Sequence, residues 1–276
     1  MGPARRPDAT AASGEAVHPM IELGGVAKRY GATLAAGPLD LTIAAGEFVA
    51  ILGGSGSGKT TTLKMINGLV RPDTGVVRID GREADSRAPH LLRRRIGYVF
   101  QEIGLFPHMS VAENIAVGPR LAGWDKARTA ARGQALLELV ALPAETGARL
   151  PAALSGGQRQ RVGVARALAA EPAIMLMDEP FGALDPVTRE GLGGDYRALH
   201  DQLGLTTVMV THDVMEALLL ADRIVVMEHG GVVADDSPAA LLADHPEPGV
   251  RALMETPRRQ AARVEALAAE RRAPDG

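Results

Sequence analysis

The segment GGSGSGKT at residues 53–60 constrains the fold of this chain more than any other feature of its sequence. It matches G-x-x-x-x-G-K-[ST] at every fixed position and lies between EFVAIL and TTLKMINGL, which predicts a strand, a loop and a helix in that order. Glycines let backbone N–H groups converge on phosphate oxygens, and the helix presents its positive N-terminal end to the same anion. We therefore predict a nucleotide site in which Lys59 reaches the β- and γ-phosphates and the Thr60 hydroxyl is a Mg²⁺ ligand.

A pair of acids closes the apolar segment AIMLMDEP, which reads as a buried strand. Buried carboxylates are costly unless they are paired or bind a metal, and nucleotides bind at the C-terminal ends of strands in α/β sheets. We therefore expect Asp178 to hold Mg²⁺, directly or through water, and Glu179 to polarise the attacking water. An ordinary acidic turn is the alternative, and the nearby phosphate loop argues against it.

The other segments alternate between strand and helix patterns after a β-rich start, which predicts a mostly parallel sheet flanked by helices. Strand patterns lie at residues 20–30, 39–53, 94–101, 173–180 and 206–212, and the segments 69–81 and 222–236 read as hairpins. Helix patterns lie at residues 110–118, 124–142, 157–172, 187–204 and 213–221. Turn signals at Pro72, Asp73 and Gly75 place the turn of the first hairpin. Interior glycines at 191, 193 and 194 each cost the helix about 1 kcal/mol relative to Ala.

The helical block between Gln101 and Glu171 interrupts this alternation and reads as an inserted subdomain, at about residues 102–171. It belongs to one large α/β domain, which we expect at residues 19–245. The polar, Ala/Pro-rich residues 1–18 are expected to form a disordered tail. Residues 246–276 are expected to form a short tail, with a charged helix beyond Pro257 that frays into disorder.

Composition narrows the class of protein. A formal net charge of −3 gives no general field to attract nucleic acid, so no nucleic-acid partner is expected. With no cysteine, the chain has no disulfide, thiolate metal site or Cys nucleophile. The longest apolar runs fall far short of the roughly 20 residues of a spanning helix, and the first residues lack the apolar region of a signal peptide. We expect a soluble protein that needs a membrane-spanning partner if it acts at a membrane.

The segment LSGGQ at residues 154–158, followed by RQRVGVARAL, resembles the signature of ABC ATPases. The resemblance runs from about Met20 to Leu242, and its elements, ending in ALD at 183–185 and His212, occur in the family's order. It implies a phosphate-loop (RecA-like) parallel-sheet core with an N-terminal antiparallel β-subdomain and an inserted α-helical subdomain. It also implies ATP hydrolysis with Mg²⁺ by two subunits paired head to tail, with two ATP molecules between them.

The resemblance also assigns roles to single residues. Tyr30 would stack on adenine, although it could instead pack at a strand end. Gln101 would contact Mg²⁺ and the attacking water, and His212 the γ-phosphate. Asp185 would line the dimer interface. Contacts to the partner's ATP fall to Ser155, Gly156, Gly157 and Gln158, where a Ser-Gly-Gly turn opening a helix makes a second anion site. Contacts to the chain's own ATP fall to Gly53, Gly54, Ser55, Gly56, Ser57, Gly58, Lys59, Thr60 and Thr61.

Within this family, IGYVFQEIGLFPHMSVAENIAV and MDEPFGALDPVTR are most similar to importer ATPases for quaternary-amine osmoprotectants such as glycine betaine, choline or carnitine. This implies a homodimer or a pair with a paralogous ATPase, permease subunits in the membrane and, indirectly, an extracytoplasmic solute-binding protein. The subunit would lie at the cytoplasmic face of the cell membrane. An importer of amino acids, polyamines or sulfonates, and a non-transport soluble ABC ATPase, are the alternatives. The chain ends too soon for paired C-terminal regulatory domains, so ionic-strength sensing by them is not expected.

Overall fold

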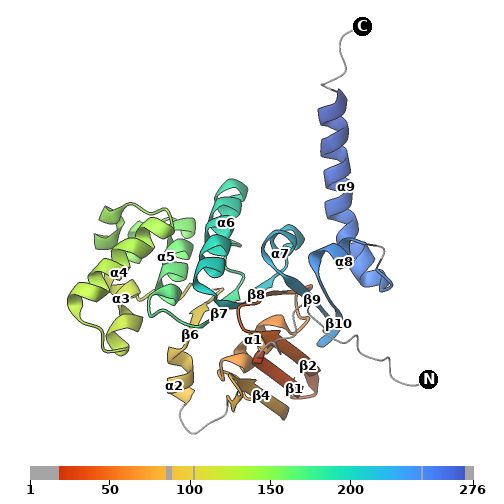
Figure 1. The fold of residues 1–276 in the computed structure, drawn as a ribbon, viewed down its shortest axis with the longest axis horizontal. Helices are drawn as coiled ribbons and strands as arrows, with labels where there is room; N and C mark the ends of the chain where they lie inside the picture. The colour runs from red at the N-terminus through yellow and green to blue at the C-terminus, as the bar shows by residue number, and fades with distance from the viewer. Residues whose placement is uncertain (1–18, 85–88, 102, 244, 271–276) are drawn as a thin grey trace.

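Two β-sheets and the helices around them make up the part of the chain that the computed structural model describes, residues 19–84, 89–101, 103–243 and 245–270. The expected tail at residues 1–18 and the last residues, 271–276, lie outside this part. Figure 1 shows the sheets at the centre, a helical block on one side and a long C-terminal helix that projects from the body. Within the described residues, no helix combines the length and the apolar character needed to cross a membrane.

The larger sheet has six strands in the order β10-β9-β3-β8-β7-β6. Every pair in it is parallel except β9 with β10, which form the predicted C-terminal hairpin. Its strands are β3 (Phe48–Leu52), β6 (Ile96–Val99), β7 (Ile174–Asp178), β8 (Thr206–Thr211), β9 (Arg223–Glu228) and β10 (Gly231–Asp236). Because helices or the second sheet cover both faces, β3, β7 and β8 are buried along their whole length; β3 is entirely apolar, β7 is apolar up to Asp178, and β8 has threonines at both ends.

The smaller sheet is antiparallel, with the order β2-β1-β4-β5. Its strands are β1 (Pro19–Tyr30), β2 (Thr33–Ala44), β4 (Thr74–Ile79) and β5 (Arg82–Glu83). It shares a core with one face of the larger sheet, because Val49 and Ile51 of β3 join the cluster that holds Ile21 and Ile43. The alternate residues of β3 face the other core, which the helices cover. The buried strand β3 therefore contributes side chains to two hydrophobic cores.

The helices surround the larger sheet (Figure 1). They are α1 (Lys59–Ile66), α2 (Pro89–Arg94), α3 (Val111–Leu121), α4 (Lys126–Leu139), α5 (Gly156–Leu168), α6 (Pro186–Leu203), α7 (Val214–Leu220), α8 (Pro238–Leu242) and α9 (Pro248–Glu270). Two short 3₁₀ helices, η1 (Ala144–Ala148) and η2 (Pro151–Ala153), connect α4 to α5. The fold is thus the predicted one, a parallel-sheet core with an antiparallel β-subdomain and an inserted helical subdomain.

Helix α6 forms despite its three glycines. Asp185 caps its first turn by accepting from Thr188 N at 3.0 Å, and Gly204 ends it in the left-handed region at φ 59°. A Cβ at Gly193 would lie 3.2 Å from Leu220 Cδ1, so the missing side chain lets α7 pack closely against α6. Added Cβ atoms at the other two glycines, 191 and 194, would meet open space. Tertiary packing therefore accounts for one of the three glycines.

The first hairpin forms at a different place from the predicted one. Its turn lies at Asp80 and Gly81, between β4 and β5, and both residues have positive φ. Pro72 and Asp73 precede β4 instead of forming a turn within the hairpin. The Asp73 carboxylate accepts from Lys28 Nζ at 2.8 Å and from the N–H of Arg29 at 2.7 Å, so it stabilises the end of β1. A long-range partner thus replaced the local turn that Pro-Asp indicated.

The C-terminal helix begins earlier than predicted. Helix α9 starts at Pro248 and continues through Pro257, which is buried inside it. Val250 and Met254 are fully buried and anchor its first turns beside α7 and α8.

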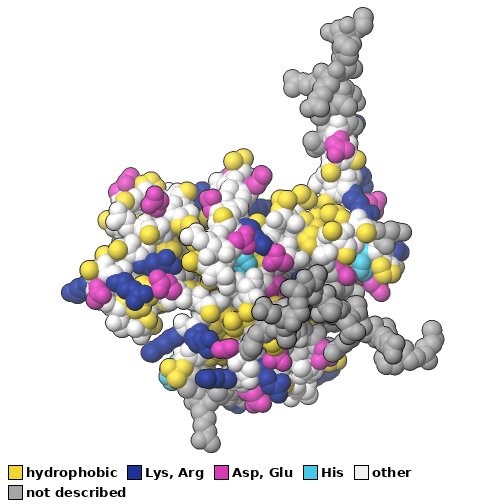
Figure 2. All heavy atoms as spheres, viewed as in Figure 1, with side chains coloured by type: hydrophobic (Ala, Val, Ile, Leu, Met, Phe, Trp, Pro, Cys, Tyr) yellow, Lys and Arg dark blue, Asp and Glu magenta, His cyan; other side chains and the backbone are white. Residues whose placement is uncertain are grey.

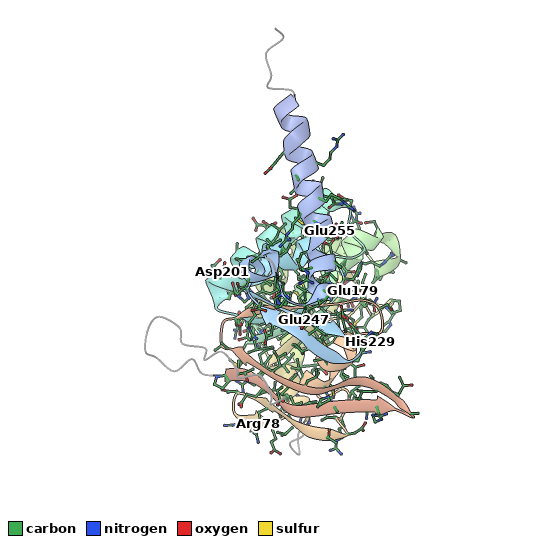
Figure 3. The ribbon with its side chains drawn as sticks, turned by 90° about the vertical axis from the view of Figure 1, so that its right-hand side faces the viewer. Arg78, Glu179, Asp201, His229, Glu247 and Glu255 are labelled. Carbon is green, nitrogen blue, oxygen red and sulfur yellow. The ribbon has the colours of Figure 1, made fainter. Side chains whose placement is uncertain are left out.

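Figure 3 shows Glu255 on α9 above the sheets and Arg78 on β4 below them. On the face drawn in Figure 2, the described acidic and basic side chains are interspersed.

Arg223 on β9 joins the two sheets. Its guanidinium donates to Glu47 Oε1 at 2.6 Å, to Asp235 Oδ1 on β10 at 2.7 Å and to the carbonyl of Thr42 on β2 at 2.6 Å. Its partners raise the pKa of Arg223 above its ordinary value against the opposing effect of burial. The planar guanidinium has five N–H donors in a fixed geometry, which the compact ammonium of a lysine does not reproduce.

We predict that Arg223→Ala lowers the free energy of unfolding by about 2 kcal/mol, because it leaves partly buried acceptors unpaired. Arg223→Lys should recover only part of the loss. Urea unfolding would measure both, with Arg82→Ala on the exposed strand β5 as the matched control. Equal stability of the Arg223→Ala and Arg82→Ala variants would contradict a linking role.

Candidate active site

The phosphate loop connects β3 to α1 as the motif predicts. Lys59, the first residue of α1, is buried, and its Nζ donates to the carbonyls of Gly53 and Gly54 at 2.8 Å each. Burial lowers the pKa of the Lys59 ammonium below its ordinary value, and the charges of Glu179 and Asp178 act in the opposite direction. The ammonium thus lies inside the loop, close to two carboxylates, where phosphate oxygens can replace the carbonyls as its acceptors.

Two glycines of the loop are sterically required. A Cβ at Gly53 would lie 2.3 Å from the carbonyl oxygen of Met227, and one at Gly58 would lie 2.4 Å from that of Ala35. Gly58 also has φ 98°, in the region that side chains disfavour. A Cβ at Gly54 would meet nothing within 4 Å. The pattern of required glycines thus follows from the packing of β9 and β2 against the loop, as well as from phosphate contact.

Thr60 and Asp178 meet across the interface between α1 and β7. The Thr60 hydroxyl donates to Asp178 Oδ1 at 2.9 Å, and Asp178 is only 4% exposed. Burial raises the pKa of Asp178 above its usual range, and the hydrogen bond from Thr60 lowers it in part. A hydroxyl and one carboxylate beside a phosphate loop are hard oxygen donors, the kind that Mg²⁺ takes together with phosphates and water.

Glu179 follows Asp178 in a left-handed conformation, with φ 48°. Its N–H donates to Val210 O at 2.9 Å, which directs the chain away from β7. Its Oε1 lies 3.1 Å from His212 Nδ1, and its Oε2 accepts from Gln101 Nε2 at 3.3 Å. Gln101, Glu179 and His212 follow β6, β7 and β8, and all three were predicted site residues. Gln101 and His212 both lie against the Glu179 carboxylate. Such an arrangement holds both oxygens of a candidate general base.

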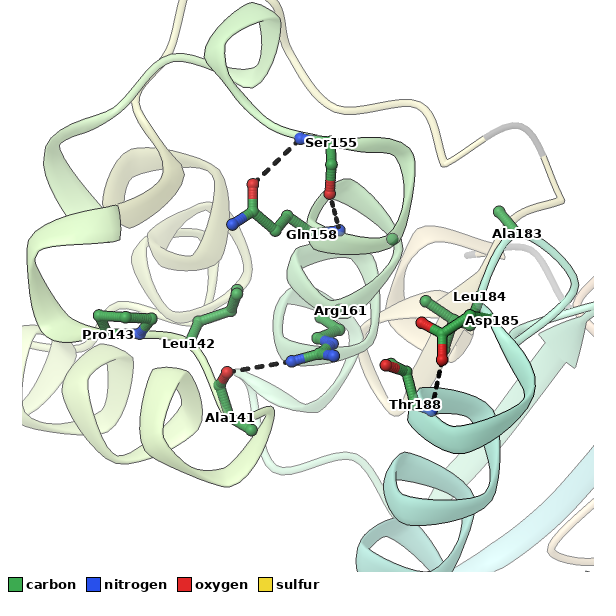
Figure 4. Close-up of a pocket in the computed structure, with 11 residues that line it drawn as sticks. Ala141, Leu142, Pro143, Ser155, Gln158, Arg161, Ala183, Leu184, Asp185 and Thr188 are labelled. Carbon is green, nitrogen blue, oxygen red and sulfur yellow. Dashed lines mark hydrogen bonds between the residues drawn. The ribbon is translucent and has the colours of Figure 1, made fainter.

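A second candidate anion site lies at the N-terminus of α5. The Ser155 hydroxyl accepts from the N–H of Gln158 at 3.2 Å, and the Gln158 side chain accepts from the N–H of Ser155 at 3.0 Å (Figure 4). This is a capping box. A Cβ at Gly157 would lie 3.0 Å from Leu184 Cδ2, so the signature packs closely against the ALD segment.

The signature and the ALD segment face a common hollow of about 270 Å³ (Figure 4). Ser155, Gly157, Gln158 and Asp185 line it, and its lining includes no described residue of the phosphate loop. The two predicted anion sites of one chain are therefore separate.

Tyr30, at the end of β1, is exposed, and Lys28 Nζ lies 5.7 Å from its ring centroid. Its stacking on adenine remains a prediction.

Sequence reasoning missed several polar residues behind Glu179. Gln160 is buried in α5 and its Nε2 donates to Glu179 O at 3.4 Å. Arg189 in α6 binds Asp213 Oδ2 at 2.6 Å and the carbonyl of Leu184 at 3.2 Å, and so connects the ALD segment to the segment that carries His212. The sequence offered a signal for Asp213, which is the first residue of the predicted helix at 213–221 and is the N-cap of α7.

A phosphate loop, a buried metal-type carboxylate and a positioned glutamate at the carboxyl edge of a parallel sheet define a phosphate-loop nucleoside triphosphatase. Comparison with known proteins defines it further. The family model described as "ABC transporter" matches residues 36–182. The chain belongs to the ABC transporter family, as an ATPase of that family.

Three relatives illustrate the range of similarity. The glycine betaine uptake system ATP-binding protein of Escherichia coli is 52% identical over 81% of this chain and 72% of its own. The glycine betaine/carnitine/choline transport ATP-binding protein of Bacillus subtilis is 50% identical over 81% of this chain and 59% of its own. The sulfate/thiosulfate import ATP-binding protein of Synechococcus elongatus is 48% identical over 80% and 63%. The last two matches span less than two thirds of those proteins.

A solved structure supports the same assignment. The dimeric post-hydrolysis state of an ATP-binding cassette bound to ADP and phosphate is 34% identical to this chain, with a TM-score of 0.75. The match covers 79% of this chain and 99% of that one. The described fold is therefore that of an ABC cassette.

We predict that Gly53→Ala weakens ATP binding at least about tenfold, because the new methyl group would overlap the carbonyl of Met227 and displace the loop. Gly54→Ala, whose methyl group meets open space in the free protein, should lose much less affinity. Equilibrium binding of a fluorescent ATP analogue would measure both. Similar affinities in the two variants would contradict the steric account.

Proposed function

We propose that this chain drives an ABC importer by binding and hydrolysing ATP in a head-to-tail dimer. The observation that carries the proposal is the separation of two anion sites: the phosphate loop with Glu179, and the signature hollow at Ser155. A second anion site without phosphate-loop residues would contribute to ATP binding if it contacts the ATP held by another subunit. The partner is a second copy of this chain or a paralogous ATPase.

Several residues of the site would share the work of hydrolysis. The loop N–H groups and Lys59 bind the β- and γ-phosphates. Thr60 and Asp178 would hold Mg²⁺. When bound, the ion neutralises negative charge on the phosphate oxygens. Gln101 would reach the same ion and the attacking water. These roles match the hard oxygen donors and the buried ammonium that the structure brings together.

Glu179 acts as the general base in this proposal. A water molecule attacks the γ-phosphorus in line with the leaving ADP oxygen and gives its proton to the Glu179 carboxylate. Gln101 and His212 hold the two carboxylate oxygens, so the base is oriented before the reaction. His212 would also contact the γ-phosphate. Asp185 lines the signature hollow and would therefore line the dimer interface, beside the partner's ATP.

Transport would follow from closure of the dimer. Each γ-phosphate would lie between the loop of one subunit and Ser155, Gly156, Gly157 and Gln158 of the other, so ATP favours the closed pair. We infer that closure of the dimer moves permease subunits in the membrane and that hydrolysis reopens the dimer. The subunit would be peripheral, at the cytoplasmic face. An extracytoplasmic binding protein would deliver the solute to the permease.

The solute that we propose is a quaternary-amine osmoprotectant such as glycine betaine, choline or carnitine. Support comes from the glycine betaine and the glycine betaine/carnitine/choline ATP-binding proteins, which are 52% and 50% identical to this chain. Sulfate or thiosulfate is the second candidate, because a relative with that function is 48% identical. The ATPase does not bind the solute, so uptake measurements distinguish the quaternary amines from sulfate or thiosulfate.

We predict that Glu179→Gln binds ATP, forms a stable dimer and hydrolyses ATP at least about 100-fold more slowly, because the amide cannot accept the proton. Light scattering at saturating Mg·ATP would measure the dimer and phosphate release the rate. Lys59→Ala, which should lose most nucleotide binding, is the comparison variant. A Glu179→Gln protein that stays monomeric with ATP, or that turns over at the wild-type rate, would contradict the assignment.

We predict that a strain lacking this gene takes up labelled glycine betaine, choline or carnitine in high-salt medium only when complemented with the wild type. Complementation with Glu179→Gln should fail, because that subunit cannot complete the cycle. Labelled sulfate is measured in parallel with redundant systems removed. Restored sulfate uptake without any effect on the quaternary amines would move the assignment to the second candidate.

A further inference from the structure

A small hollow lies behind the proposed base. Its lining residues are Glu179, Gly182, Arg189, Thr211, His212, Asp213 and Glu216. The space open to the centre of a water molecule is about 20 Å³. One ordered water needs roughly 10–15 Å³ by that measure and two to four polar partners. The hollow therefore has room for one water, and six of its seven lining residues have a polar or charged side chain.

Glu216 is a buried carboxylic acid of this hollow to which the proposed mechanism gives no role. It lies in the first turn of α7 and is only 8% exposed. The pattern D-V-M-E at 213–216 is that of a capping box, in which Glu216 would accept from the N–H of Asp213. In the structure that N–H donates to the Thr211 hydroxyl at 3.0 Å instead. The Glu216 carboxyl lines the hollow and interacts with Thr211.

A second observation points to a missing polar partner in the same place. Among the described residues, Arg189 Nε is one of four buried side-chain atoms that have no hydrogen-bond partner. The other nitrogens of Arg189 bind Asp213 and Leu184 O. Arg189 lines the hollow with Glu216 and Glu179. A water in the hollow could accept from Arg189 Nε and donate to carboxylates, which would satisfy the buried donor.

We propose that Glu216 is the proton acceptor behind Glu179, with one water in the hollow linking the two carboxyl groups. The proposal rests on the proposed function, because it gives a destination to the proton that Glu179 removes from the attacking water. Glu216 acts through Glu179 and touches neither phosphate nor ADP, so its role is that of a positioning and proton-holding residue.

The proton balance is simple. Attack forms a bond from the water oxygen to the γ-phosphorus and breaks the bond from that phosphorus to the ADP oxygen. One proton of the attacking water passes to Glu179, then through the linking water to the Glu216 carboxylate. Glu179 is thereby ionised again for the next cycle. Glu216 releases the proton to solvent after the phosphate leaves, and no oxidant or reductant takes part.

The charges around Glu216 suit a group that exchanges a proton near neutral pH. Burial raises the pKa of Glu216 to about 7, opposed by hydrogen bonding from Thr211. The Asp213 charge also raises it, and Arg189 from α6 and His212 lower it. β3 contributes only apolar side chains, and among the described residues no charged group of α9 is one of these neighbours. Because the folded pKa exceeds that of an exposed glutamate, the stability from the bound proton is present at low pH and is lost as pH rises through about 7.

The test is the pH dependence of single-turnover ATP hydrolysis by the 276-residue chain, with the protein in excess over Mg·ATP. For the wild type we expect a rate that falls as pH drops from 8 to 6, about tenfold per unit at most, because protonated Glu216 cannot accept. Glu216→Gln should react at least about tenfold more slowly at pH 8 and lose this fall, with ATP affinity unchanged. Glu216→Asp should keep a pH-dependent fall with a shifted midpoint. Glu138→Gln, which removes an exposed carboxylate of α4, is the control and should match the wild type.

A wild-type pH profile in Glu216→Gln, whatever its rate, would overturn the proposal, because a structural residue would change the rate but not the shape. If that variant does not fold, an unshifted midpoint in Glu216→Asp would do the same. Thermal unfolding without nucleotide gives an independent check: the melting temperature should fall less between pH 5.5 and 8 in Glu216→Gln than in the wild type. An equal fall in both would count against the proposal. Wild-type hydrolysis by Glu179→Gln would instead refute the proposed function itself.

Discussion

The parallel pairing of β3, β8, β7 and β6 is the constraint on which the site depends. Parallel strands end at the same edge of a sheet, so the segments that follow them converge there. The phosphate loop follows β3, Gln101 follows β6, Glu179 follows β7 and His212 follows β8. The register of these strands places Gln101 and His212 within hydrogen-bonding distance of the Glu179 carboxylate. No local pattern in the sequence could achieve this.

Burying charges at this edge has an energetic consequence. Burial lowers the pKa of Lys59 and raises that of Asp178, so each charged form is disfavoured by its surroundings. Each pKa also has a neighbour that offsets part of the effect of burial: the charges of Glu179 and Asp178 for Lys59, and the Thr60 hydroxyl for Asp178. Sites that bind charged ligands are where such perturbed groups gather. A nucleotide with its cation would complete the charge pairs that the protein alone leaves incomplete.

The polar groups behind Glu179 connect features that face different neighbours. Arg189 binds the carbonyl of Leu184, beside the signature hollow, and also Asp213, which caps the helix after His212. Through these contacts, a change at the proposed interface with a partner subunit would reach the segment that holds Glu179. The close packing of Gly193 against Leu220 holds α6 and α7 together near the same contacts.

Short-range chemistry determined much of this protein from its sequence. The phosphate loop, the buried strand ending in Asp178 and the signature at 154–158 each require a few adjacent residues, so they and the fold class were predictable. The turn at Pro72 and Asp73 was predicted wrongly, because Asp73 binds the distant end of β1. The Asp213–Glu216 pattern indicates a capping box, but Thr211 takes the N–H that Glu216 would have bound. Tertiary structure decided these cases, because a polar group chooses among all the partners that the fold brings near it, and most of those are far away in the chain.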